Sequence, residues 1–377
     1  MDRIKNIKLQ IKQIIKNWLY FISGLKRPVF LGNKQNNLNK IKKTQQKFVE
    51  ECTDKDIEII ELFEKKYHYT IQPHEHYIQN NIDNLLEKIF SFFTNRNYIP
   101  NIGIEIEFYL LDKTTNIETF YKTIYDFSNK NNIYIYEIEQ ERGNGQFEIK
   151  FKPYQNINKL IIDFNVLKNF LLNNFNITFC DLPFKNDCGS ALQINLNIID
   201  KNTQKNLFGR NEDKTQESKL LLNSVAGLLK TTNLFLPFYL SKTKSMDRFD
   251  KFVNMYLYKN GKIPAPTCNS WGINNRTCSI RIPIPKNIYQ LNNYFKYDDE
   301  NRRVEFRVPS SDADLKFVLF CVLSSVAFGI SNDLEPIEAT YNNVLLNCDG
   351  YEKIELLNYD IDVFINILDN LYCNNVL

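Results

Sequence analysis

The chain has 377 residues, 43% of them hydrophobic, which suffices for one large domain with an accessory region or for two domains. Its formal charge of +3 is the small difference between 47 basic and 44 acidic residues, so charge gives no case for nucleic acid as a partner. The eight cysteines form no C-x-x-C pair, and no run of about 20 apolar residues occurs. We therefore expect free thiols in a reducing, cytoplasmic compartment, with no membrane span and no secretory signal.

Residues 1–30 are predicted to form a basic amphipathic helix. Apolar residues recur at spacings of three and four from Ile4 to Leu25, which places them along one side of a helix, and Pro28 ends the pattern. Such a helix packs on the protein body or on another subunit, or it contacts an anionic membrane surface through residues 1–27. Both interpretations stay open.

Residues 31–97 are predicted to hold a linker followed by a helical accessory region. The segment 31–45 is polar, and residues 46–67 and 77–95 show apolar stripes with helical spacing. A further domain is expected over residues 98–377.

From Pro100 onwards the pattern becomes one of alternating strands mixed with helices. Strands are predicted over 103–111, 133–139, 146–151, 190–199, 278–285 and 302–309, and helices over 156–175, 218–240 and 314–330. Because these elements follow in mixed runs rather than in strict βαβ alternation, we expect an α+β fold with a largely antiparallel sheet and flanking helices.

Acidic residues stand at regular places in several predicted strands. Glu105 and Glu107 are two apart and share a face of their strand, Glu141 and Glu148 flank a Gly-Asn-Gly turn, and Glu305 lies on a third strand. Converging carboxylates are costly unless a cation lies between them, and hard divalent ions such as Mg²⁺ or Mn²⁺ prefer oxygen ligands. The alternative is that each strand turns its acids to water and its apolar residues inward.

Arginines form a second group near the same strands. Arg276 and Arg281 occur five apart in SWGINNRTCSIRIP, and Arg307 shares a strand face with Glu305 and Arg303. Guanidinium groups match the oxygens of phosphates and carboxylates. Acids together with arginines at strand ends indicate phosphoryl transfer from a metal-bound nucleotide.

Five stretches, in order along the chain, resemble motifs of the glutamine synthetase catalytic domain. They are GIEIEFYLLD, ERGNGQFEIKF, LPFKNDCGSALQINL, APTCNSWGINNRTCSIRIP and RRVEFRVPSSDAD. One such motif is a weak signal, but five in the family's order are specific, and they cover roughly residues 98–335.

The resemblance implies a metal-binding role for the acids. Glu107, Glu141 and Glu148 correspond to the carboxylates of one metal site, and Glu105 and Glu305 to those of a second site beside the nucleotide phosphates.

The resemblance also implies roles for four arginines and a glycine. Arg276 and Arg281 correspond to arginines that meet the transferred phosphoryl group of ATP, and Arg307 to one that serves the γ-glutamyl phosphate. Gly189 corresponds to the glycine that lets the backbone approach the amino acid substrate. Arg248, placed by counting from AGLL to KSMDRF, corresponds to the arginine that binds the substrate carboxylate.

The chain departs from the family pattern at three places. Gln193 stands where the family has a metal-binding histidine, so the site holds two metals with altered affinity or loses one. Pro264 stands at the place of the flap glutamate, and no Glu occurs in residues 249–266. The family's N-terminal β-grasp domain, which completes the active site of the neighbouring subunit, is not recognisable in residues 1–97.

The resemblance implies an ATP-dependent carboxylate–amine ligase that uses Mg²⁺ or Mn²⁺. Glutamate, or a similar acid, is expected to be activated as an acyl phosphate and then captured by ammonia or an organic amine. The alternative is a degenerate, non-catalytic homologue that binds nucleotide or a partner. A homo-oligomer is a further expectation, because family members share active sites between subunits.

Overall fold

The computed structural model describes residues 73–210, 216–241, 243–284, 299–348 and 350–355, with the side chains of residues 73–81 and 243 left aside. The chain divides into two compact units, Met1–Leu85 and Leu86–Leu377, and the fold and site below belong to the second. The helix predicted over residues 1–30 and most of the predicted accessory region lie outside the described residues. Helix α4 (Pro73–Thr94) begins four residues before the helix predicted over 77–95.

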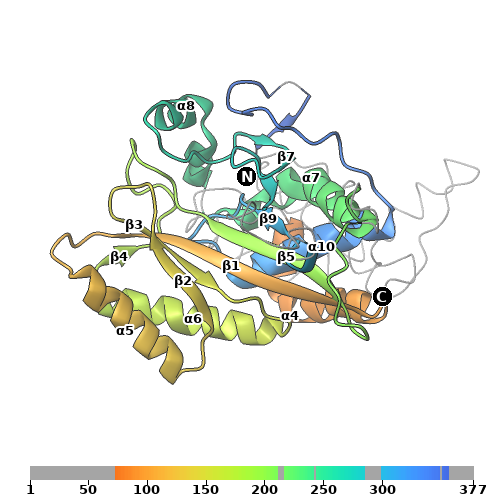
Figure 1. Ribbon diagram of the computed structural model, residues 1–377, viewed down its shortest axis with the longest axis horizontal. Helices are drawn as coiled ribbons and strands as arrows, with labels where there is room; N and C mark the ends of the chain where they lie inside the picture. The colour runs from red at the N-terminus through yellow and green to blue at the C-terminus, as the bar shows by residue number, and fades with distance from the viewer. Residues whose placement is uncertain (1–72, 211–215, 242, 285–298, 349, 356–377) are drawn as a thin grey trace, which may run out of the picture. The chain divides into compact units, whose positions relative to one another are not determined.

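An eight-stranded sheet is the centre of the second unit (Figure 1). Its order is β2-β3-β1-β5-β9-β8-β7, with β4 paired to β1, and every pair is antiparallel except β7 with β8. The strands are β1 (Tyr98–Leu110), β2 (Ile135–Gln140), β3 (Gln146–Phe151), β4 (Ile177–Thr178), β5 (Leu192–Asp200), β7 (Trp271–Ile273), β8 (Ile280–Ile282) and β9 (Val304–Phe306). A separate pair joins β6 (Cys268–Asn269) to β10 (Glu352–Lys353). The prediction of a largely antiparallel α+β fold is confirmed.

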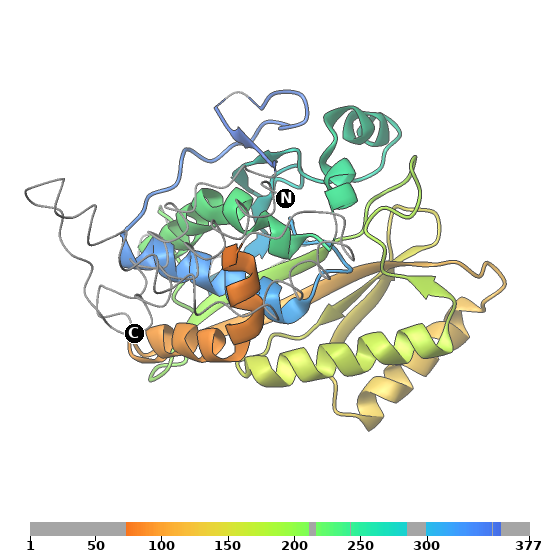
Figure 2. The ribbon, with the colours of Figure 1, turned by 180° about the vertical axis from the view of Figure 1, so that it is seen from behind.

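Helices pack against one face of this sheet. They are α5 (Ile117–Lys130), α6 (Ile157–Asn174), α7 (Lys219–Tyr239) and α10 (Leu315–Ser331). Two further elements follow α7 in the chain: the 3₁₀ turn η1 (Thr243–Phe249) and helix α8 (Lys251–Lys259). Seen from behind, α6 crosses the sheet, and α7 and α10 lie side by side (Figure 2). None of the described helices has both the length and the hydropathy needed to cross a bilayer.

The sequence did not predict α5 and α8, although each begins at a capped position. The side chains of Asn116 and Asp250 accept hydrogen bonds from the backbone N–H groups of Thr119 and Val253, and such caps stabilise a first helical turn. In α5, Phe120 and Ile124 are buried on one side at a spacing of four. These capping residues were the sequence signal from which the two helices could have been predicted.

Strand β1 also begins earlier than predicted, because the strand continues through Pro100. Pro100 lies opposite Ile198 of β5, whereas pairing with β3 starts only at Glu105. The missing N–H of proline therefore faces an unpaired edge, where it removes no ladder hydrogen bond. Strand β8 stops at Ile282 rather than at residue 285, and Pro283 follows it directly.

Strand alternation separates an apolar face from a polar face. Phe108 of β1 and Phe147 of β3 both contact Phe120 of α5, and Phe306 of β9 contacts Tyr239 of α7. The intervening residues of the same strands point to the opposite face, since side chains alternate along a strand. That opposite face carries Glu105, Glu107, Glu148, Lys150, Gln193, Asn195, Arg281 and Glu305, all of which line a pocket.

Two glycines allow α7 and α10 to pack closely behind the sheet. A Cβ atom at Gly227 would lie 2.0 Å from the backbone oxygen of Ser325, and one at Gly329 would lie 2.0 Å from that of Asn223. Thr231 donates to the hydroxyl of Ser325 across the same interface at 2.6 Å. These helices thus form a tightly packed pair that contacts β9 through Tyr239 and Phe306.

Candidate active site

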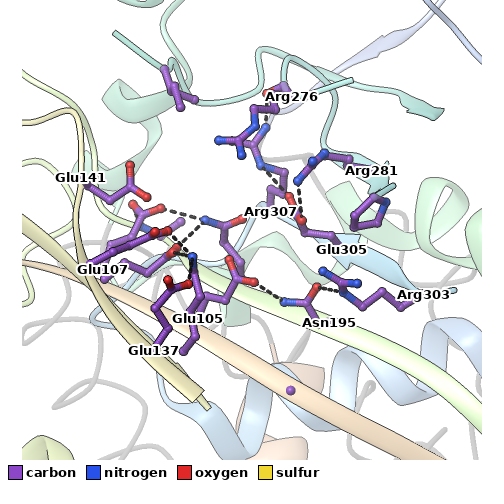
Figure 3. Close-up of a pocket in the computed structure, with 18 of the residues that line it drawn as sticks. Glu105, Glu107, Glu137, Glu141, Asn195, Arg276, Arg281, Arg303, Glu305 and Arg307 are labelled. Atoms are coloured by element: carbon purple, nitrogen blue, oxygen red, sulfur yellow. Dashed lines mark hydrogen bonds and ion pairs between the residues drawn. The ribbon is translucent and has the colours of Figure 1, made fainter. Parts of the chain in front are cut away.

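The polar face of the sheet lines a pocket of about 760 Å³. The lining includes residues of β1, β2, β3, β5, β8 and β9 and of the turn before β3, together with the segment Ile263–Pro266. The structure brings all the predicted site residues to it: Glu105, Glu107, Glu141, Glu148, Gly189, Gln193, Arg248, Arg276, Arg281, Glu305 and Arg307. Figure 3 shows carboxylates gathered on one side of this pocket and Arg276, Arg281 and Arg303 on the other, with Arg307 and Glu305 between them.

Glu107 lies at the centre of the acidic side, directly opposite Glu148 in the β1–β3 register. Its oxygens accept hydrogen bonds from Ala191 N at 2.8 Å, from Gln193 Nε2 at 2.8 Å and from Gln146 Nε2 at 3.3 Å. Despite these donors, desolvation and the nearby charge of Glu141 raise the pKa of Glu107 to about 7. The carboxylate is therefore costly to ionise when no cation is beside it.

Glu148 is 2% exposed and stands in the middle of the acids. Burial, followed by the charges of Glu105 and Glu107, raises its pKa well above the usual value. Glu139, Glu141 and Glu148 each offer a carboxylate oxygen, and these oxygens lie within 4.8 Å of one another. Three oxygens at such separations match the ligand type of Mg²⁺ or Mn²⁺.

Lys150 lies among the same acids, one alternation beyond Glu148 on β3. Its ammonium is 3.2 Å from Glu148 Oε2 and 3.2 Å from Glu137 Oε2, and it also pairs with Glu139. The side chain is only 15% exposed. A fixed positive charge therefore already stands within the acidic side of the pocket.

Gln193 of β5 links the two central acids. Its amide Nε2 donates to Glu107 Oε1 at 2.8 Å and to Glu148 Oε1 at 3.1 Å. Its neighbour on the same face, Asn195, donates to Glu105 Oε1 at 2.9 Å and accepts from Arg303 Nε at 2.8 Å. Amides thus connect the acidic side of the pocket to the basic side.

Glu305 lies on the basic side, where it is paired with arginines. Arg281 Nη1 is 2.8 Å from Glu305 Oε2, and Arg307 Nε is 3.5 Å from Glu305 Oε1. Burial alone would raise the pKa of Glu305, but Arg281, Arg307 and Arg303 outweigh it and lower that pKa. Unlike Glu107 and Glu148, Glu305 is therefore held ionised by the protein itself.

Arg248 and Gly189 form one close contact at the pocket wall. A Cβ atom at residue 189 would lie 2.6 Å from Arg248 Cγ and 3.0 Å from the backbone oxygen of Asp181, so only glycine fits beside this arginine. Arg248 is 3% exposed, donates to the Val308 carbonyl, and has no hydrogen-bond partner at Nε. A buried guanidinium with an unpaired N–H at a pocket wall suits an anionic ligand.

The turn between β2 and β3 is fixed by backbone and side-chain contacts. Glu141 N donates to Gln146 O at 2.9 Å, and Gly145 has a φ of 85°, which favours glycine. Asn144 N donates to Asp187 Oδ2 at 3.0 Å, and Lys262 pairs with Asp187. These contacts hold Glu141 and Glu148 on the two sides of the turn.

Comparison with known proteins identifies the family of this chain. The model of the glutamine synthetase catalytic domain matches residues 111–361, about two-thirds of the chain. The chain belongs to the glutamine synthetase family.

Curated family members resemble the chain at low identity. Gamma-glutamylputrescine synthetase of Escherichia coli K12 is 25% identical over 297 residues, which are 70% of this chain and 58% of that protein. Glutamate–methylamine ligase of Methyloversatilis universalis is 25% identical over 301 residues, 70% of this chain and 60% of that protein. The chain thus spans less than two-thirds of the length of these relatives.

Solved structures of the glutamine synthetase family share the fold. Plasmodium falciparum glutamine synthetase superposes with a TM-score of 0.58 at 18% identity, covering 78% of this chain and 72% of that one. The complex of GmaS with ADP gives a TM-score of 0.58 at 17% identity, covering 78% and 68%. The expected glutamine synthetase-like fold is confirmed.

Members of the glutamine synthetase family use ATP and divalent metals, and the residues of this pocket fit both. Glu139, Glu141 and Glu148 supply hard oxygen ligands, and a cation among them would relieve the repulsion that raises the pKa of Glu148. On the opposite side, Arg281 keeps a buried Nε without a hydrogen-bond partner, and Arg276 is exposed, so both guanidinium groups suit phosphate oxygens.

Among the pocket residues that were not predicted from the sequence are Glu137, Glu139 and Lys150. Glu137 and Glu139 belong to β2, and both pair with Lys150. The period-two pattern that identified Glu105 and Glu107 also runs through residues 137, 139 and 141, and from Glu148 to Lys150. That alternation was the signal that could have found them.

Proposed function

We propose that this chain is an ATP-dependent ligase that joins glutamate, or a similar acid, to an organic amine. The observation that supports it best is one pocket in which acids from β1, β2, β3 and β9 face arginines from β8, from the 3₁₀ turn η1 and from the two residues that flank β9. Acids that hold a divalent cation beside arginines that hold phosphate are the requirement of phosphoryl transfer from ATP.

The proposed reaction has two steps. A γ-carboxylate oxygen of glutamate attacks the γ-phosphorus of ATP, the bond to the bridging oxygen breaks, and ADP leaves with that oxygen. The amine nitrogen then attacks the acyl carbon, loses a proton, and expels phosphate that carries the former carboxylate oxygen. An amide, ADP and phosphate are the products, so atoms and charge balance without a redox partner.

The acidic side of the pocket is assigned to the divalent cation. Glu139, Glu141 and Glu148 would hold it, with Glu107 beside them, and the bound ion would neutralise phosphate charge. The chain's own contribution is to keep Glu107 and Glu148 at fixed positions through the hydrogen bonds of Gln193 and Gln146.

The basic side is assigned to the phosphates and the amino acid. Arg276 and Arg281 would contact the transferred phosphoryl group, and Arg307 the acyl phosphate. Arg307 is oriented for this by donating to the carbonyls of Arg276 and Cys278, the latter at 3.3 Å. Arg248 would bind the substrate carboxylate, and Gly189 leaves it the space to do so.

An organic amine is favoured over ammonia as the nitrogen donor. Pro264 and its neighbours Ile263 and Ala265 line the pocket where the family pattern places the flap glutamate. An alkyl amine has apolar groups of its own to bind, whereas ammonium depends on nearby acids. Two of the matched relatives bear the names gamma-glutamylputrescine synthetase and glutamate–methylamine ligase, which support this choice.

The test is to measure ADP release by the full chain with Mg²⁺, ATP and glutamate against ammonium, methylamine, a diamine and an aromatic amine. We expect ADP release that depends on both glutamate and an alkyl amine, with a product mass equal to glutamate plus amine minus water. Glutamine formation from ammonium as fast as amide formation from the best amine would contradict the choice of donor.

The test variant Glu148→Ala is compared with a matched control, Glu118→Ala. Glu148→Ala removes a buried pocket acid and is expected to lower the rate at least a hundredfold, whereas Glu118→Ala alters an exposed position on α5 and leaves the rate unchanged. Binding of Mg²⁺–ATP without ADP release on any amine would instead favour a non-catalytic binding module.

A further inference from the structure

We propose that the ammonium of Lys150 is a built-in cation of this pocket and takes the place of one of the two divalent ions that the family pattern implies. The pocket then holds one divalent cation, on Glu139, Glu141 and Glu148. This inference rests on the proposed function for the expectation that a divalent cation binds at all.

The contacts of Lys150 are those of a cation at the centre of an acidic cluster. Three carboxylates pair with its Nζ: Glu137 and Glu148, each at 3.2 Å, and Glu139. Glu139 and Glu148 also belong to the three-acid group suited to a metal. Lys150 thus contacts two of the three acids that would hold the divalent cation.

The backbone fixes Lys150 at this place. In the sheet, Lys150 lies opposite Glu105 of β1 on one side and opposite Glu137 of β2 on the other. Period two then places it on the same face as Glu148. Its side chain is 15% exposed, so it is not a surface lysine that reaches the acids by chance.

The two acids that correspond to the family's second metal site already have partners in the protein, and one of them, Glu305, is neutralised by arginines. Glu305 is paired with Arg281 at 2.8 Å and lies 3.5 Å from Arg307. Glu105 accepts from Asn195, which in turn accepts from Arg303. A second divalent ion would therefore meet repulsion from these arginines and from Lys150, and both carboxylates already have partners.

The grouping of the acids also favours a single divalent cation in the pocket. Within the part of the chain that the structure describes, the group of Glu139, Glu141 and Glu148 is the one set of three acids whose oxygens lie within 4.8 Å of one another. Gln193, at the place of the family histidine, donates its amide to Glu107 and Glu148 and so binds the acids rather than a second ion.

The experiment counts Mn²⁺ ions bound to the full chain by electron paramagnetic resonance of the free ion, with and without a non-hydrolysable ATP analogue. The variants are Lys150→Gln, which removes the charge, and Lys150→Arg, which keeps it. Lys152→Gln is the matched control, because Lys152 is exposed two residues further along the chain. Thermal unfolding of each variant, with and without Mn²⁺, is measured in parallel.

We expect one Mn²⁺ per chain in the wild type, in Lys150→Arg and in Lys152→Gln, and two in Lys150→Gln, the second at least tenfold weaker. Without metal, Lys150→Gln should unfold several degrees below the wild type, and Mn²⁺ should restore most of that loss. This metal-dependent rescue also shows that the variant folds.

Two ions in the wild type, or one ion in both the wild type and Lys150→Gln, would overturn the role given to Lys150 and leave the ligase proposal intact. Absence of Mn²⁺ binding by every protein would instead overturn the ligase proposal itself, so the two failures are distinguishable.

Discussion

Replacing Glu107 by glutamine separates the stability of the metal-free protein from its ability to bind metal. Glu107→Gln keeps the size of the side chain but removes one negative charge from the acidic side of the pocket. In the absence of a divalent ion this charge opposes folding, because desolvation and Glu141 raise the pKa of Glu107 from 4.5 to about 7. The variant should therefore be more stable than the wild type without metal.

The size of the gain follows from the pKa. At about 1.4 kcal/mol per pKa unit, a rise from 4.5 to about 7 corresponds to roughly 3 kcal/mol near pH 7.5. Glu107 is partly exposed to the pocket, and screening by water reduces this to about 2 kcal/mol. The amide accepts one hydrogen bond fewer than the carboxylate, which costs about 1 kcal/mol. A net gain of about 1 kcal/mol corresponds to a rise in Tm of roughly 2–4 °C.

The assay is thermal unfolding at pH 7.5 in chelator and in Mg²⁺. We expect Glu107→Gln to unfold above the wild type in chelator, and Mg²⁺ to stabilise the variant less than the wild type, because Glu107 lies beside the three acids that would hold the ion. Glu118→Gln, at an exposed position of α5, should resemble the wild type in both buffers. A variant that is less stable in chelator, yet keeps the full Mg²⁺ shift, would refute the assignment of these acids to a metal.

Stability without metal should fall as pH rises, because the folded state holds the Glu107 proton up to its pKa of about 7 while the unfolded state loses it near 4.5. Urea unfolding in chelator should show a loss of about 2 kcal/mol between pH 4.5 and 7 that Mg²⁺ abolishes, and a stability that rises over this range would contradict it. Gly189→Ala should raise the KM for glutamate at least tenfold, because its Cβ would displace Arg248, and an unchanged KM would show that Arg248 does not bind this substrate. Gly329→Ala should lower the free energy of unfolding by about 2 kcal/mol, because its Cβ would lie 2.0 Å from the Asn223 oxygen, with catalysis per folded molecule unchanged in steady-state assays.

Much of the fold was predictable because its signals are local. Alternation identified β1, β3, β5 and β9, and apolar periodicity identified α6, α7 and α10. The order of the strands was not predictable in this way, since β5 pairs with β1 and β9 through contacts between residues far apart in the sequence. Such pairings depend on the whole sheet rather than on any one segment.

The pocket was predictable to the extent that its residues resemble family motifs. All the residues that the resemblance selected line the pocket. They include Arg248, whose position was predicted by counting residues from AGLL to KSMDRF. Lys150 and Glu139 were not selected, because the resemblance assigns neither residue a role, although Lys150 stands within the stretch ERGNGQFEIKF. Their importance follows from the β2–β3 pairing, which brings Glu139 opposite Glu148 and Glu137 opposite Lys150.

The most direct test of the ligase proposal follows one oxygen atom. The full chain is incubated with ATP, Mg²⁺, the best amine and glutamate labelled with ¹⁸O in its γ-carboxylate, and the released phosphate is analysed by ³¹P NMR. We expect one ¹⁸O in each phosphate, because the carboxylate oxygen attacks phosphorus and leaves with it. Unlabelled phosphate, released at the same rate as ADP, would show that water attacks ATP and would contradict the formation of an acyl phosphate.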